Sequence, residues 1–140
     1  MKRLTKNFIF SEFTDTKHTD LLPANIYYAV DNMDKVIDLA KFAQEIRDFL
    51  GVPMTITSGV RYSALNNRVG GSATSQHLKC EAIDFIPSKM SIQEAFKRIR
   101  NSNLKWGQLI IESSNGKEWI HISKGSKCEV LKYDGKYTKI

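Results

Sequence analysis

Two short segments place residues that can bind a metal inside stretches that otherwise look like buried strands. Asp84 lies in the middle of the apolar run 81–87, and His121 lies between Ile120 and Ile122. An ionised carboxylate is strongly unfavourable in an apolar interior unless a cation or hydrogen-bond donors meet it. Both positions therefore call for a polar or charged partner.

His77 is the third candidate, and it comes before the Asp84 strand in a Gly/Ser-rich approach typical of a loop. The chain has three histidines, and the remaining one, His18, falls in a polar run that we interpret as a surface loop. Two imidazoles and a carboxylate leave a fourth tetrahedral position for water, as in catalytic rather than structural zinc sites. We therefore expect His77, Asp84 and His121 to hold one zinc ion per chain. Taken singly, each is also compatible with a hydrogen-bonded core histidine or a turn aspartate.

Hydrolysis by such a site needs a base beside the zinc-activated water. Glu118 stands three residues before His121, and we take it as the expected base. Residues three apart point to opposite faces of a regular strand, so this requires a twisted strand start. Glu112 is the alternative, because a two-residue turn at Asn115-Gly116 would pair it with Trp119, on the face of His121. Either acid can instead be a solvated hairpin carboxylate.

Arg61 closes the turn Ser58-Gly59-Val60-Arg61 and is a second candidate catalytic residue. Its guanidinium carries a permanent charge and a planar fork of donors, so it can bind a substrate carboxylate or a developing oxyanion. The ordinary alternative is a surface salt bridge.

The remaining pattern predicts a single α+β domain over residues 1–140, with a central, mainly antiparallel sheet and packed helices. A helix is expected over residues 24–50, with a possible break near Asp31-Asn32, and a capping box at 91–94 opens another that ends near 101. The apolar face of the first helix is expected to comprise Val30, Met33, Ile37, Ala40, Ile46 and Phe49. The other expected elements are a short helix at 64–69, strands at 54–57, 81–87, 108–112 and 118–123, and a turn at Asp134-Gly135.

Composition restricts the class of protein. The chain is 41% hydrophobic, and its apolar runs are too short to span a membrane. We see no secretory signal pattern and expect cytoplasmic synthesis without membrane insertion. Cys80 and Cys128 lack metal-ligand spacing and are expected to be thiols. The net charge of +6 favours a polyanionic partner: nucleic acid, an anionic membrane or an anionic cell wall. The sequence has no recognisable nucleic-acid-binding pattern, which argues against nucleic acid.

Several ordered motifs resemble the zinc D-alanyl-D-alanine carboxypeptidases and related cell-wall peptidases, including VanX-type dipeptidases and phage endolysins. The resemblance runs from residue 7 to residue 123. Ser75-Gln76-His77 followed by Ala82-Ile83-Asp84 is similar to the Ser-x-His and Ala-x-Asp motifs of the family. Trp119-Ile120-His121 is similar to its late Trp-x-His, and the Arg61 turn to its Ser-Gly-x-Arg.

The resemblance implies the hedgehog/DD-peptidase fold and a zinc peptidase that cleaves D-amino-acid-containing bonds of peptidoglycan, as a D-Ala-D-Ala carboxypeptidase or an endolysin-type endopeptidase. It implies that His77, Asp84 and His121 are the zinc ligands, that Arg61 contacts the substrate or the oxyanion, and that Ser75 supports the site. Glu118 matches the position of the VanX-type base. Relatives of the phage type place an acid where Glu112 stands. Cys80 occupies a position that is usually Gly. We expect a monomer that reaches the wall after release; the alternative is a non-catalytic wall-binding or phage structural module that keeps the zinc.

Overall fold

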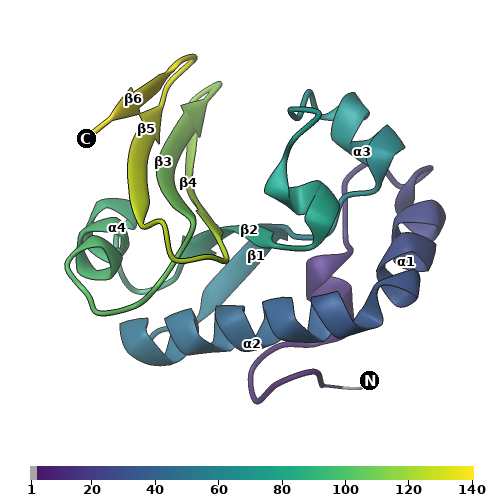
Figure 1. Ribbon diagram of the computed structural model, residues 1–140, viewed down its shortest axis with the longest axis horizontal. Coiled ribbons are helices and arrows are strands. Elements are labelled where there is room, and N and C mark those ends of the chain that lie inside the picture. The colour runs from purple at the N-terminus through teal and green to yellow at the C-terminus, as the bar shows by residue number, and fades with distance from the viewer. Residues whose placement is uncertain (1–2) are drawn as a thin grey trace.

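A six-stranded sheet forms the centre of the molecule in the computed structural model, which describes residues 3–140 (Figure 1). The elements in chain order are η1 (Phe10–Phe13), α1 (Leu22–Asp31), α2 (Met33–Leu50), β1 (Met54–Ser58), α3 (Ser63–Arg68), η2 (Gln76–Lys79), β2 (Ala82–Pro87), α4 (Ile92–Arg100), β3 (Gln108–Ser114), β4 (Lys117–Ser123), β5 (Glu129–Tyr133) and β6 (Tyr137–Lys139). The strand order is β1-β2-β4-β3-β5-β6, and only the β3–β5 pair is parallel among these strands. The predicted mainly antiparallel α+β domain is therefore confirmed.

Helices α2 and α4 cover one face of the sheet (Figure 1), and the hydrophobic core lies between these helices and the sheet. Side chains alternate between the two faces of a strand. Ile83 and Phe85 of β2 point into this core, so Asp84 between them points to the opposite face. The same alternation buries Ile120 and Ile122 of β4 and turns His121 away from the helices. The candidate site therefore occupies the face of the sheet that α2 and α4 leave free.

Neighbouring residues of β2 allow a test of this two-faced arrangement. Phe85 is fully buried, whereas Ile86 is 39% exposed. We expect Phe85→Ala to lower the free energy of unfolding by about 3–5 kcal/mol, because it removes a core aromatic ring and leaves a cavity. Ile86→Ala should cost clearly less. Urea denaturation of both variants measures the difference; equal losses would contradict the assignment of faces.

The β3–β4 hairpin turns at the predicted dipeptide. Asn115 and Gly116 have φ angles of 52° and 76°, and positive values at both central residues define the type I′ turn that hairpins prefer. This two-residue turn sets the register and pairs Glu112 with Trp119. The pairing expected from the sequence is thus confirmed, and with it the face that Glu112 shares with His121.

The long helix predicted over residues 24–50 is two helices, α1 and α2, separated at Asn32. Asn32 leaves the helical region, with φ −120° and ψ 33°, as the predicted break allowed. Ala40 and Ile46 are buried as expected, but Val30 and Phe49 are 54% and 44% exposed; at the end of α2 the buried position is Leu50, one residue after Phe49. The buried residues of α2 are Val36, Leu39, Ala40, Ala43, Ile46 and Leu50.

Two further expectations need correction. Ser91 Oγ accepts from Glu94 N at 3.0 Å and caps α4, but the Glu94 carboxylate binds Arg98 rather than returning to the cap, so the capping box is half formed. The Asp134-Gly135 turn joins strands β5 and β6, which the sequence did not predict.

Among the described residues, no helix combines the length and the apolar character needed to cross a membrane.

Candidate metal centre

The structure brings His77, Asp84 and His121 together in one buried group. Asp84 Oδ1 lies 3.2 Å from His77 Nε2 and 2.9 Å from His121 Nδ1. One ligand-type atom from each residue lies within 4.8 Å of the others. The three side chains converge although the two histidines are far apart in the chain, so the fold itself assembles the set that the sequence predicted.

Strand pairing and a capped turn hold these side chains. Asp84 of β2 is directly opposite His121 of β4, which places both side chains on one face at adjacent positions. His77 comes from the short helix η2, which Ser75 caps: its Oγ accepts from His77 N at 3.2 Å. Ser75 thus orients the segment that carries His77, in keeping with the supporting role expected of it.

The hydrogen bond between His77 Nδ1 and Gly59 indicates the protonation state of the other ring nitrogen, Nε2, which faces Asp84. His77 Nδ1 lies 2.7 Å from the carbonyl oxygen of Gly59, which only accepts, so Nδ1 carries the proton. The Nε2 of a neutral ring then directs a lone pair at Asp84 Oδ1, also an acceptor. Burial lowers the pKa of His77, and the Asp84 carboxylate only partly offsets this, so a second proton is disfavoured. A metal cation satisfies both atoms, and donation to a carbonyl is the usual support of a metal-ligating histidine.

The spacing and charge of the group also fit zinc. Ligands at about 2.0–2.1 Å from zinc lie about 3.3 Å apart at the tetrahedral angle, close to the 3.2 and 2.9 Å found around Asp84 Oδ1. Burial raises the pKa of Asp84, but the two imidazoles lower it more, so the carboxylate is ionised, as a ligand must be. His121 Nε2 is buried and has no hydrogen-bond partner within residues 3–140. The protein alone therefore leaves bonding capacity in this group unused.

The turn before Arg61 requires a glycine at position 59, because the N-terminal segment packs closely against it. A Cβ at Gly59 would lie 2.8 Å from the backbone oxygen of Phe13, which is already bonded by Val60 N at 2.7 Å. The absence of a side chain lets the N-terminal segment pack against this turn. That packing keeps the Gly59 carbonyl in place to receive His77.

Arg61 lies behind the carboxylate of the group. Its Nη2 is 3.3 Å from Asp84 Oδ2, and the Ser58 hydroxyl and the Asn66 amide oxygen accept from its other nitrogens. Its side chain is 14% exposed. Burial lowers the pKa of Arg61, while Asp84 and Glu112 raise it, and a guanidinium stays charged under these conditions. Arg61 is therefore a fixed positive charge at the site, not a surface salt bridge.

The two candidate bases lie on opposite faces of the hairpin. Glu112 Oε1 is 3.8 Å from His121 Nδ1. Glu118 pairs across the hairpin with Ser113, on the helix-covered face, and its Oε1 accepts from Gln93 Nε2 of α4 at 2.6 Å. Because β4 is regular between Lys117 and Ser123, the twisted start that Glu118 requires is not found. The structure thus brings Glu112, and not Glu118, to the group.

The environment of Glu112 favours its neutral form relative to an exposed glutamate. Burial is the largest cause and raises its pKa, with a further rise from the Asp84 charge; His121 and Arg61 oppose this. The nearby indole N–H of Trp119 lowers the pKa of Glu112 as well. This N–H does not reach hydrogen-bond geometry with Glu112 and has no hydrogen-bond partner within residues 3–140. Glu112 is therefore a half-buried acid with polar neighbours, beside the group.

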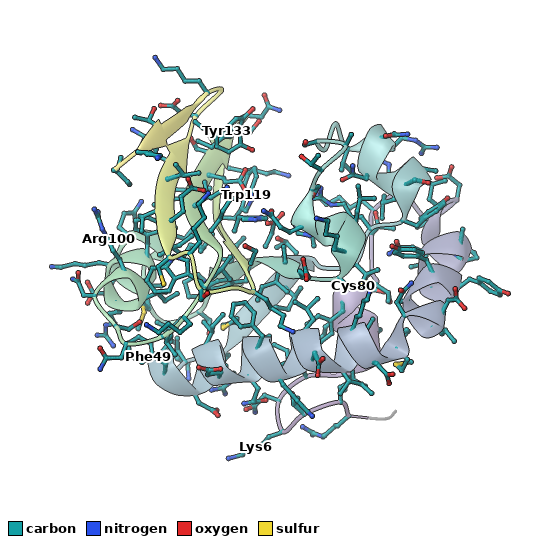
Figure 2. All side chains as sticks on the ribbon, viewed as in Figure 1. Lys6, Phe49, Cys80, Arg100, Trp119 and Tyr133 are labelled. Carbon is teal, nitrogen blue, oxygen red and sulfur yellow. The ribbon has the colours of Figure 1, made fainter. Side chains whose placement is uncertain are left out.

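The structure also places the residues whose role the sequence left open. Cys80 has φ 58°, the left-handed conformation that suits the usual glycine, at a cost of about 1–2 kcal/mol for a side-chain-bearing residue. Its thiol packs in the core between η2 and α2, outside the metal-ligand group, and burial raises its pKa (Figure 2). Cys128 is also a free thiol. His18 lies on the loop before α1 and is not one of the three clustered ligand-type residues, although it lines a cavity that Asp84 also lines.

A cavity of about 490 Å³ opens over the group and contains residues that sequence reasoning missed. Gln76 donates to Gln108 at 3.0 Å, which donates to Glu129 at 2.8 Å, so this polar chain ties η2 to β3 and β5. Tyr133 and Tyr137, with ring centroids 4.7 Å apart, form another part of its wall. They reach it because β5 pairs in parallel with β3 and places Tyr133 beside Glu112, a long-range pairing with no local signal.

Comparison with known proteins agrees with this geometry. The family described as peptidase M15 matches residues 11–123. No curated protein matches the chain. The matched residues run from η1 to the end of β4 and contain His77, Asp84, His121 and both candidate bases. This protein therefore belongs to the peptidase M15 family, whose members are zinc-dependent peptidases.

Proposed function

We propose that this protein hydrolyses D-amino-acid-containing peptide bonds of bacterial peptidoglycan and holds one zinc ion with His77, Asp84 and His121. The observation that carries the proposal is the buried group that lines a cavity, in which Asp84 Oδ1 lies 3.2 Å from His77 Nε2 and 2.9 Å from His121 Nδ1. Family membership supports peptide hydrolysis, and the resemblance of the motifs to wall peptidases supports the substrate class. All three ligands come from one chain, so the site is complete in a monomer.

Zinc in this group would supply an electrophile that polarises a substrate carbonyl and lowers the pKa of a bound water. The protein supplies the remaining parts. Arg61, fixed by Ser58, Asn66 and Asp84, presents positive charge where a substrate carboxylate or a developing oxyanion can be met. Because its donors are already in place, this interaction requires little reorganisation during the reaction.

Glu112 is the base in this proposal. Its carboxylate faces the group across 3.8 Å and lines the same cavity, so it can accept a proton from the attacking water and return it to the leaving amine. Glu118, the base expected from spacing alone, stays a competing assignment that the contact with Gln93 does not favour. The two glutamates differ in face, and separate substitutions distinguish them.

Metal analysis combined with a hydrolysis assay tests the function. Protein purified without chelator should contain about one zinc per chain, and it should release D-alanine or cleaved stem peptide from D-Ala-D-Ala peptides or purified murein. Removal of the metal should abolish turnover, and added zinc should restore it. Murein binding with zinc present but without cleavage would instead identify a non-catalytic wall-binding module. Absence of both zinc and restored hydrolysis would overturn the proposal.

A further inference from the structure

A second cavity, of about 720 Å³, adjoins the first and shares part of its lining, including Asp84 of the metal group. The loop before α1 and the start of β4 contribute to its walls. Arg61, Asp84 and Trp119 line both cavities, so the candidate site stands at their junction. Figure 2 shows Trp119 on the β3–β4 hairpin. Space for a ligand therefore extends beyond the first cavity into a second one that Asp84 also lines.

Two lysines from distant parts of the chain line this second cavity. Lys17 comes from the loop before α1 and Lys117 from the first position of β4, and both line the cavity. The proximity of the Lys117 ammonium lowers the pKa of Lys17. Within the part of the chain that the structure describes, neither lysine has a carboxylate within salt-bridge distance. By contrast, Lys127 and Lys132 have acids at 3.9 and 3.7 Å.

The acids that line the same cavity do not neutralise this pair. Asp84 is engaged by the two imidazoles and Arg61. Glu118 accepts from Gln93, and Asp15 forms no salt bridge among residues 3–140. Two ammonium groups that approach each other without a counter-ion repel, and an anion between them removes that repulsion. The arrangement thus favours a negatively charged ligand.

The geometry points to Lys17 and Lys117 as an anion-binding arm of the cleft that takes a side-chain carboxylate of the peptide substrate. This inference rests on the proposed function and deepens it. A peptide whose carboxylate lies between the lysines and whose scissile bond lies at the metal group must continue across Trp119 toward the first cavity. The protein is then an endopeptidase for acidic peptides, because residues on both sides of the cleaved bond have a place in the cleft.

The test uses zinc-loaded protein and peptides of alternating L and D residues that differ only in glutamate or glutamine at one position, moved stepwise along both sides of the cleaved bond. At one position, wild-type kcat/KM should be about fivefold higher for the glutamate peptide, the scale expected for an exposed ion pair. In Lys17→Gln/Lys117→Gln this ratio should fall to about one. The matched control, Lys41→Gln/Lys97→Gln, removes the same charge from exposed positions of α2 and α4 and should keep the preference.

The inference fails if wild type shows no glutamate preference at any position, if the double variant keeps it, or if the control pair also loses it. A separate measurement covers the case in which no peptide is cleaved, which would overturn the proposed function itself. NMR resonances of the Lys17 and Lys117 side chains should shift on addition of the preferred glutamate peptide and not of its glutamine partner. Equal shifts, or none, would overturn the anion-binding arm independently of turnover.

Discussion

Replacing Glu112 by Gln should lower kcat by about 10²- to 10⁴-fold, the usual contribution of a general base, while zinc stays bound. The side chain keeps its size but can no longer accept a proton. Its carboxylate lies 3.8 Å from His121 Nδ1 and is not one of the three proposed ligands, so the substitution should leave zinc affinity unchanged. Turnover on a D-Ala-D-Ala peptide and zinc content of the same preparation measure both parts of the prediction.

Glu118→Gln is the matched control on the same hairpin. Glu118 contacts Gln93 of α4 on the other face of the sheet, so its replacement should leave turnover close to wild type. The reverse result, with Glu118→Gln inactive and Glu112→Gln active, would restore the base expected from spacing. Loss of zinc in Glu112→Gln would show that this acid serves the metal rather than the proton transfer.

Asp84→Asn should weaken zinc binding by more than about a hundredfold, above the range for loss of a residue that only supports a ligand. The asparagine amide keeps the shape of the side chain but removes the negative charge of the carboxylate, which contacts both imidazoles and the Arg61 guanidinium. Turnover should be lost at zinc concentrations that saturate wild type. Competition with a metal-binding dye measures the affinity, and circular dichroism shows whether the fold persists.

Asp20→Asn provides the same chemical change at an exposed site. Asp20 forms a surface pair with Arg68 at 3.0 Å, and it lies outside the metal-ligand group. Its replacement should leave zinc affinity unchanged. If folded Asp84→Asn bound zinc as tightly as Asp20→Asn, Asp84 would not be a ligand.

Local patterns predicted much of the fold, and their failures have identifiable causes. The Asn115-Gly116 turn and the apolar alternation of β2 and β4 were visible in the sequence because turn geometry and strand period are local properties. The buried face of α1 and α2 was misplaced at Val30 and Phe49, because residues three and four apart both fit a helical period and only packing decided that Leu50, not Phe49, is buried. Strands β5 and β6 were missed because the parallel pairing of β5 with β3 joins segments without a local signal.

The sequence by itself predicted the candidate donor set and the strand faces of Asp84 and His121. Three scarce ligand-type residues stand in segments where burial would otherwise be unfavourable, and the strand period turns Asp84 and His121 away from the core. Only the tertiary structure decided which glutamate faces them, that Cys80 stays in the core, and that Lys17 and Lys117 line one cavity. These outcomes depend on contacts between distant segments, and residue spacing along one strand carries no information about what packs against it.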